Sequence, residues 1–233
     1  MIHPIRHGKV TLALHELRAG EGRALLLLHG LGERSPAALP ERVRAWTGPV
    51  FALDFTGHGA STVPRGGGYS AEVLMADADA ALARLGSATL VGRGLGAYVA
   101  LLLAGARPRQ VRGAILCDGP GLAGGGSSPG SPTVIVPWLG SRGEDATPDP
   151  FAQAELARDL RPPDYATSFL RQATQLSGLA RPVSVCAAER PEWLRAVVSD
   201  PEVEETTLDA ALAYYATVER MRIVGSSEAF EVR

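Results

Sequence analysis

The sequence predicts an α/β fold, a doubly wound and mostly parallel sheet with helices on both faces. Two observations carry this prediction. Short, continuously apolar runs recur along the chain between glycine, proline or charged residues, which is typical of buried parallel strands. Segments with the apolar spacing of helices lie between these runs, and such alternation of strand and helix favours a parallel sheet that is covered on both sides.

Six apolar runs are predicted to be strands: residues 10–14, 24–28, 50–53, 88–91, 114–117 and 182–187. The clearest helix follows Ser70, which can cap it, and ends at Gly86. A second helix is predicted to begin near Leu95 and to stop before Pro108, because proline cannot continue a helix.

Two segments interrupt this regular alternation. Residues 119–132 are rich in glycine, serine and proline and are predicted to form a mobile loop. Residues 147–178 mix prolines with short helical patterns and are predicted to form a small lid over the sheet edge that faces the ligand. The aromatic residues of this segment are expected to serve mainly in packing.

Length and charge limit the classes of function. A chain of 233 residues with 45% hydrophobic content can bury a substantial core, and a single domain over residues 1–233 is expected. The charges nearly cancel, with 23 basic and 25 acidic residues, so no basic stripe indicates nucleic acid or a membrane surface. No apolar run has the length of a membrane span, and a cytoplasmic protein is expected. The expected partner is a small-molecule ligand, with a homodimer as a further expectation.

The cysteine and metal-ligand patterns favour neither a disulfide nor a cofactor. Cys117 and Cys186 each end an apolar run, where a thiol is expected to act as a small buried hydrophobe rather than as a reactive group. No cluster of His, Cys, Asp or Glu has the spacing of metal ligands. No metal and no cofactor is therefore predicted.

Three glycine-rich motifs follow predicted strands: His-Gly-Leu-Gly at residues 29–32, Asp-Phe-Thr-Gly-His-Gly at 54–59 and Gly-Arg-Gly-Leu-Gly at 92–96. Glycines at the end of a buried strand let backbone N–H groups turn toward a ligand oxygen. The N–H groups of Leu31 and Leu95 are therefore predicted to form the two halves of an oxyanion site.

Together these motifs resemble the α/β-hydrolase superfamily, in its esterase-like branch, over residues 9–118 and more weakly to residue 221. The resemblance implies a nucleophile at the centre of a Gly-x-Ser-x-Gly elbow, followed along the chain by an acid and a histidine. Gly94 stands at the position of the nucleophile, and all five histidines lie within the first 58 residues. Residues 188–191, Ala-Glu-Arg-Pro, replace the expected acid motif, which leaves Asp118 as the alternative acid.

The leading hypothesis is a non-catalytic hydrolase-like protein that binds a small ligand or a partner through a retained oxyanion-type pocket. The ligand is expected to be acidic or carbonyl-containing and to be held by the N–H groups of Leu31 and Leu95. A serine hydrolase needs a nucleophile, a base and an orienting group, and two of these three parts are missing. Arg93 is interpreted either as the charge of an anion site or as a surface ion pair. The candidate ligand-binding residues are His29, Gly30, Leu31, His58, Arg93, Gly94 and Leu95, with no confident catalytic residue.

Three alternatives remain. An active enzyme could use His58 or Asp118 as a base that acts on bound water. A dinucleotide-binding protein would use Gly92, Gly94 and Ala97 as a G-x-G-x-x-A fingerprint, with Asp118 about 21 residues beyond it. The fold could also survive as an interaction or dimerisation module, which predicts a pocket filled by its own side chains. In the structural interpretation of the same residues, Asp118 caps its turn and His58 bonds to neighbouring backbone.

Overall fold

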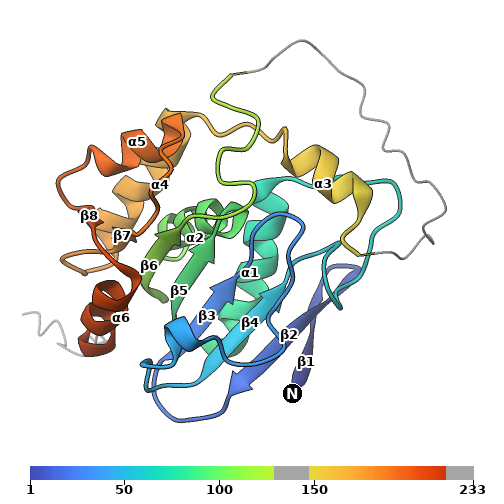
Figure 1. Cartoon of the computed structure of the whole chain (residues 1–233), viewed down its shortest axis with the longest axis horizontal. Helices are drawn as coiled ribbons and strands as arrows, with labels where there is room; N and C mark the ends of the chain where they lie inside the picture. Colours follow the sequence, from blue (N-terminus) through green and yellow to red (C-terminus); the bar gives the residue numbers. More distant parts are fainter. Residues whose placement is uncertain (129–146, 219–233) are drawn as a thin grey trace, which may run out of the picture.

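The computed structural model describes residues 1–128 and 147–218, and a single eight-stranded sheet runs through them in the order β1-β2-β4-β3-β5-β6-β7-β8 (Figure 1). The strands are β1 Ile2–His7, β2 Val10–Arg18, β3 Ala24–Leu28, β4 Val50–Asp54, β5 Ala88–Arg93, β6 Val111–Cys117, β7 Val183–Val185 and β8 Glu204–Glu205. The pairs β1–β2 and β2–β4 are antiparallel, and the other pairs are parallel. The predicted α/β fold with a mostly parallel sheet is confirmed.

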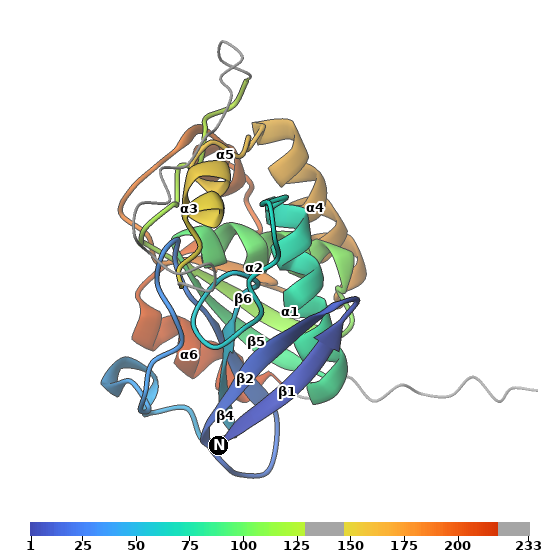
Figure 2. The same ribbon diagram turned by 90° about the vertical axis from the view of Figure 1, so that its right-hand side faces the viewer.

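Helices cover both faces of this sheet. They are η1 Glu41–Val43, α1 Ala71–Leu85, α2 Leu95–Ala106, α3 Pro150–Leu156, α4 Pro163–Leu176, α5 Glu192–Val198 and α6 Leu208–Thr217. Figure 2 shows α1, α2 and α4 on one side of the sheet and α6 on the other. Each side therefore has its own apolar core.

The strand residues divide between the two cores by simple alternation. In β3, Leu26 and Leu28 pack in the core beneath α1 and α2, whereas Leu25 packs in the core beside α6. In β6, Leu116 belongs to the first core and Ile115 to the second. Side chains of successive strand residues point to opposite faces, so a strand covered on both sides must be apolar throughout. Full burial of each such leucine or isoleucine contributes about 1.5–3 kcal/mol.

The strongest local signals predicted the element boundaries well. The run at residues 24–28 coincides with β3, and α1 has Ser70 as its N-cap and Gly86 as its C-cap. The Ser70 hydroxyl accepts a hydrogen bond from the Val73 N–H at 3.4 Å. Gly86 has φ 77°, a conformation that glycine adopts without a steric penalty.

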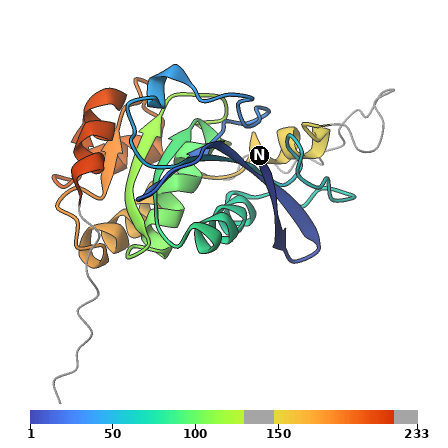
Figure 3. The ribbon, with the colours of Figure 1, turned by 90° about the horizontal axis from the view of Figure 1, so that it is seen from below.

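Strands at the sheet edges were not predicted. β1 is an edge strand whose residues alternate between exposed and half-buried, and it contains Pro4. Proline is tolerated at an edge because no neighbouring strand needs its missing N–H. Figure 3 places the β1–β2 hairpin at one end of the sheet and α6 at the other. The two-residue strand β8 is too short to produce a periodic signal.

The connection between β3 and β4 positions the site. These strands are parallel, and a parallel crossover usually contains a helix that covers the sheet. Here the connecting residues 29–49 contain only the three-residue turn η1. The sheet face beside α6 is therefore left partly uncovered near the carboxyl ends of its central strands.

The two irregular segments differ in how they pack. Residues 119–128 contain no helix or strand, and the rest of the predicted loop, 129–132, lies outside the described residues. Residues 147–178 contain α3 and α4, and α4 packs against α2 and α5. A lid role for the whole segment stays a prediction. Within the described ranges, no helix is long and apolar enough to cross a membrane.

Candidate functional site

A sharp strand-to-helix turn lies at the centre of the carboxyl edge of the sheet. β5 ends at Arg93, α2 begins at Leu95, and Gly94 between them has φ 58° and ψ −119°. Glycine adopts this backbone conformation without a steric penalty, whereas a residue with a Cβ atom rarely does. The predicted elbow therefore exists, with glycine at its apex.

The segment after β6 packs directly on the elbow. A Cβ atom at Gly94 would overlap the Pro120 carbonyl oxygen and would lie 2.5 Å from the Gly119 carbonyl carbon. A Cβ atom at Gly30 would lie 2.9 Å from the Pro120 Cδ and 3.0 Å from its carbonyl oxygen. The backbone of Gly119 and Pro120 therefore fills the space directly above Gly94, and the prediction of an open ligand pocket there is wrong.

The two predicted oxyanion donors converge on one oxygen atom, which belongs to the protein itself. The N–H groups of Leu31 and Leu95 both donate to the Pro120 carbonyl, at N···O distances of 2.9 Å. An oxyanion site places two N–H groups about 2.7–3.1 Å from the oxygen that gains charge in the transition state. Pro120 thus occupies the place that a substrate oxygen would take, and we call residues 119–122 the plug.

Buried polar groups hold the plug. The Trp193 indole N–H donates to the Leu122 carbonyl at 2.9 Å, and the Arg161 guanidinium donates to the carbonyls of Gly121 and Leu122. The Arg161 guanidinium carbon also lies 4.8 Å from the ring centroid of Tyr98. Burial lowers the pKa of Arg161 to about 10, so its charge persists at neutral pH. The Arg161 cation, which is 1% exposed, therefore holds the plug in place.

His29 and His58 lie behind the oxyanion donors as a pair of neutral rings, with centroids 5.0 Å apart. His29 Nδ1 bonds the Gly30 carbonyl at 2.8 Å, and its Nε2 accepts the Phe55 N–H at 3.2 Å. Burial, together with the facing His58, lowers the pKa of His29 to about 4.

His58 repeats this arrangement. Its Nδ1 bonds the Thr56 carbonyl at 3.1 Å, and its Nε2 accepts the Gly32 N–H at 3.4 Å. Burial also lowers its pKa, and the side chain is fully buried. With both ring nitrogens engaged, neither histidine offers a free base, and both brace the turn at residues 29–32.

Arg93 and Asp118 are also engaged. Arg93 donates through Nε to both Glu33 carboxylate oxygens, at 3.1 and 3.0 Å, and through Nη1 to the Asp118 carbonyl at 3.1 Å. This hydrogen bonding raises the pKa of Arg93. Burial raises the pKa of Glu33, but the hydrogen bonds from Arg93 and from the Gly30 N–H outweigh this effect, and its pKa is lowered.

The Asp118 carboxylate links two loops. It accepts the backbone N–H groups of Ala188 and Glu189, at 2.6 and 2.9 Å. These bonds join the end of β6 to the residues that follow β7. Asp118 therefore anchors residues 188–189, which lie where the α/β-hydrolase motif would place the catalytic acid.

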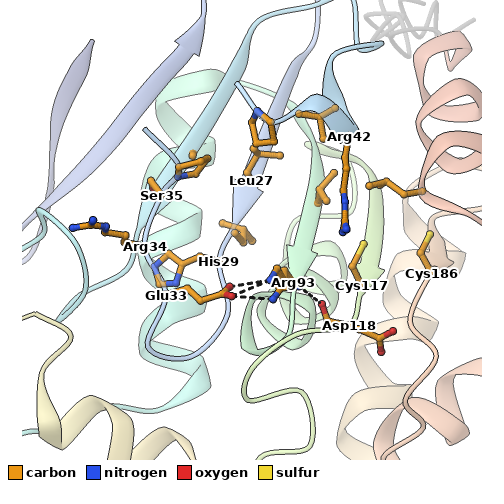
Figure 4. Close-up of a pocket in the computed structure, with 17 residues that line it drawn as sticks. Leu27, His29, Glu33, Arg34, Ser35, Arg42, Arg93, Cys117, Asp118 and Cys186 are labelled. Carbon is orange, nitrogen blue, oxygen red and sulfur yellow. Dashed lines mark hydrogen bonds and ion pairs between the residues drawn. The ribbon is translucent and has the colours of Figure 1, made fainter. Parts of the chain in front are cut away.

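An open cavity of about 530 Å³ lies beside the plug, on the sheet face that the β3–β4 connection leaves uncovered (Figure 4). Its apolar wall comes mainly from β3, η1, β4, β5 and α6, and these residues are Leu27, Leu28, Val43, Ala52, Val91 and Leu208. Its polar groups are His29, Glu33, Arg34, Ser35, Arg42, Arg93, Cys117, Asp118 and Cys186. An apolar cavity of this size with a few polar groups is typical of a small-molecule site.

Arg42 lines this cavity and has no neutralising partner among the described residues. Among residues 1–128 and 147–218 no hydrogen bond or ion pair engages its side chain, whereas the adjacent Arg44 pairs with Glu41 at 2.8 Å. Figure 4 shows the Arg42 guanidinium pointing toward Cys117, while Arg34 points away from the other labelled side chains. A free guanidinium above an apolar wall suits the carboxylate of a small ligand.

The structure divides the predicted ligand-binding residues into two groups. Gly30, Leu31, Gly94 and Leu95 gather around Pro120, whereas His29 and Arg93 line the cavity. His58 lies behind both groups. No group of three or more His, Cys, Asp or Glu in the described part of the chain could hold a metal ion.

Sequence reasoning missed the plug, Glu33, Arg42 and the position of both cysteines on the cavity wall. The Gly-Pro-Gly sequence at residues 119–121 was the one available signal, since it predicts a tight turn directly after a strand. Nothing local in the sequence indicates that this turn fills the oxyanion site.

A mostly parallel sheet, a sharp strand-to-helix turn and two convergent N–H groups match the architecture of the α/β hydrolases, with Gly94 where that family carries its nucleophile. The model of the alpha/beta hydrolase family matches residues 25–227, and the chain belongs to that family. No curated protein matches the sequence.

Solved structures share this fold at low identity. The thioesterase domain from the curacin biosynthetic pathway is 19% identical with a TM-score of 0.66, and the match covers 93% of this chain and 98% of that domain. An N-formylmaleamic acid deformylase from Pseudomonas putida S16 is 20% identical with a TM-score of 0.56, covering 91% and 94%. Est1E from Butyrivibrio proteoclasticus, solved with ferulic acid bound, is 13% identical with a TM-score of 0.59, covering 92% and 96%.

Proposed function

We propose that this protein is a non-hydrolytic α/β hydrolase that binds a small carboxylate with an apolar body in the cavity beside the plug. The observation that carries the proposal is the bonding of the Leu31 and Leu95 N–H groups to the Pro120 carbonyl. These donors cannot stabilise a tetrahedral intermediate while a carbonyl of the chain occupies them. The absence of a side chain at Gly94 supports the same conclusion.

The remaining side chains support binding more than catalysis. An enzyme that used His58 as its base would need a fully buried ring to exchange its backbone partners for substrate. An enzyme that used Asp118 would have to release the two N–H groups that this carboxylate accepts. A dinucleotide would require the N–H of Leu95 at the helix N-terminus, which Pro120 occupies.

The ligand would be bound by the cavity and not by the oxyanion donors, which Pro120 occupies. Its apolar wall would bury a hydrocarbon or aryl body, and Arg42 would pair with the carboxylate at the rim. Arg93 adds little net charge because Glu33 already neutralises it. The proposed setting is the cytoplasm, where small organic acids are common ligands.

Calorimetric titration tests the ligand class and the role of Arg42. Straight-chain carboxylates from butanoate to decanoate and phenylacetate are expected to bind, and the corresponding primary alcohols are expected to bind more weakly. Arg42→Ala should lower the carboxylate affinity roughly 10- to 100-fold, since a hydrogen-bonded charge contributes about 1.5–3 kcal/mol. Arg44→Ala is the matched control, because Arg44 lies on the same turn but does not line the cavity, and it should leave the affinity unchanged.

Three results would contradict the proposal. The first is equal affinity for carboxylates and alcohols, and the second is no detectable binding of any probe at millimolar concentration. The third is an equal loss of carboxylate affinity in Arg42→Ala and Arg44→Ala. The second result would favour an interaction module. Turnover of the corresponding p-nitrophenyl esters or thioesters, or labelling by a fluorophosphonate, would contradict the non-hydrolytic assignment.

A further inference from the structure

Cys117 and Cys186 meet at the wall of the cavity. β6 and β7 are parallel, with Leu116 paired to Val185, and each cysteine is the next residue along its chain. The Cys186 N–H donates to the Leu116 carbonyl at 2.8 Å, which continues this register to the cysteines. Both side chains pack on the α6 side of the sheet and line the cavity.

This placement has the dimensions of a disulfide. Neighbouring strands lie about 4.8 Å apart, and a disulfide joins Cα atoms roughly 4.4–6.8 Å apart. The two thiols are free and half-buried. Cys186 lies just beyond the end of β7, so a small movement there does not disturb the sheet.

The surroundings distinguish the two thiols. The neighbouring Cys186 thiol lowers the pKa of Cys117 more than burial raises it, and the charges of Arg42 and Arg93 also lower it. The neighbouring Cys117 thiol and burial raise the pKa of Cys186. Figure 4 shows the Arg42 guanidinium directed at Cys117. Cys117 is therefore the thiol of the pair that ionises more readily, and the thiolate is the form that reacts with oxidants.

We propose that Cys117 and Cys186 form a reversible disulfide at the cavity wall when a hydroperoxide enters the cavity. The Cys117 thiolate attacks a peroxide oxygen, which breaks the O–O bond and leaves Cys117 as a sulfenic acid, with one alcohol or water released. The Cys186 sulfur then attacks the Cys117 sulfur, and its proton leaves with the hydroxyl group as water. The two thiols lose two electrons in total, and the peroxide gains them.

A metal-binding role for the pair is less well supported. A thiolate metal site needs further ligands, and no group of three or more His, Cys, Asp or Glu among the described residues could supply them. The proposal does not depend on the carboxylate ligand proposed above, because the pairing of the two thiols exists without it.

Intact-mass and alkylation measurements on the full chain test the proposal. Hydrogen peroxide is expected to remove both alkylatable thiols together, to lower the mass by two hydrogens, and to leave the protein free of intermolecular cross-links. Dithiothreitol should restore both thiols. In Cys186→Ser, Cys117 should instead accumulate as a dimedone-reactive sulfenic acid. In Cys117→Ser, oxidation of Cys186 should be at least roughly tenfold slower than oxidation of Cys117 in the wild-type protein, since burial disfavours the Cys186 thiolate.

The wild-type protein decides the question even if a variant fails to fold. Both thiols could stay alkylatable under peroxide that oxidises glutathione, or Cys117 could gain two oxygens without a cross-link. The disulfide could also join two molecules. Each of these results would overturn the proposal.

Discussion

Replacement of Gly94 by alanine is expected to lower the free energy of unfolding by about 3–5 kcal/mol, the sum of backbone strain and steric overlap. Alanine tolerates φ 58° with ψ −119° poorly, and its Cβ would overlap the Pro120 carbonyl oxygen. In a chain of this size the loss corresponds to a Tm decrease of about 10 °C. Urea unfolding followed by circular dichroism measures it.

Gly8→Ala is the matched control for this substitution. Gly8 shares φ 58°, but a Cβ atom there would have no atom within 4 Å. The control should therefore lose only about 1–2 kcal/mol from backbone strain. Equal losses in the two variants would mean that the plug moves aside freely. Gly94→Ser should be as unstable as Gly94→Ala and should not hydrolyse esters, since no histidine follows His58.

The stability of the protein is expected to fall as the pH drops below 6.5. His29 has a pKa of about 4 in the folded chain and an ordinary value of 6.5 when unfolded. The unfolded chain therefore takes up this proton first, so the contribution of His29 is complete above pH 6.5 and is lost progressively toward pH 4. The slope within this window is about 1.4 kcal/mol per pH unit. His58, whose pKa is also lowered, acts in the same direction.

Urea unfolding at pH 7, 6 and 5 measures this dependence. His29→Gln should remove much of the slope, because glutamine keeps one donor and one acceptor but does not titrate. His3→Gln is the control, since His3 lies in the β1–β2 hairpin and bonds to Glu16 at 2.8 Å. An unchanged slope in His29→Gln would show that the buried ring does not resist protonation.

The sequence predicted those parts of the fold that local patterns determine. The apolar run of β3, the cap at Ser70 and the glycine at the end of α1 are short-range signals, and they gave correct boundaries. β1 escaped prediction because Pro4 and alternating exposure hide its strand character. Its assignment depends on pairing with β2, which no local pattern reports.

The candidate site was predictable only in part, for the same reason. The motifs at residues 29–32 and 92–96 correctly predicted a glycine elbow and two N–H groups that converge on one oxygen. The identity of that oxygen depends on Arg161 and Trp193, which lie about 40 and 70 residues further along the chain than the plug. A contact at such a distance in sequence leaves no periodic trace. The pairing of Cys117 with Cys186 was missed in the same way, because it depends on strand register.

Amide hydrogen exchange at Leu31 and Leu95, measured by NMR without added ligand, shows whether the Pro120 carbonyl occupies the oxyanion donors. The first N–H groups of a helix normally lack a partner and exchange quickly. Because both amides donate to Pro120, they should exchange at least roughly 100-fold more slowly than the Glu192 amide, which begins α5 without a side-chain cap. Exchange of Leu31 and Leu95 as fast as Glu192, with protection only after a carboxylate is added, would show an open oxyanion site and contradict the account.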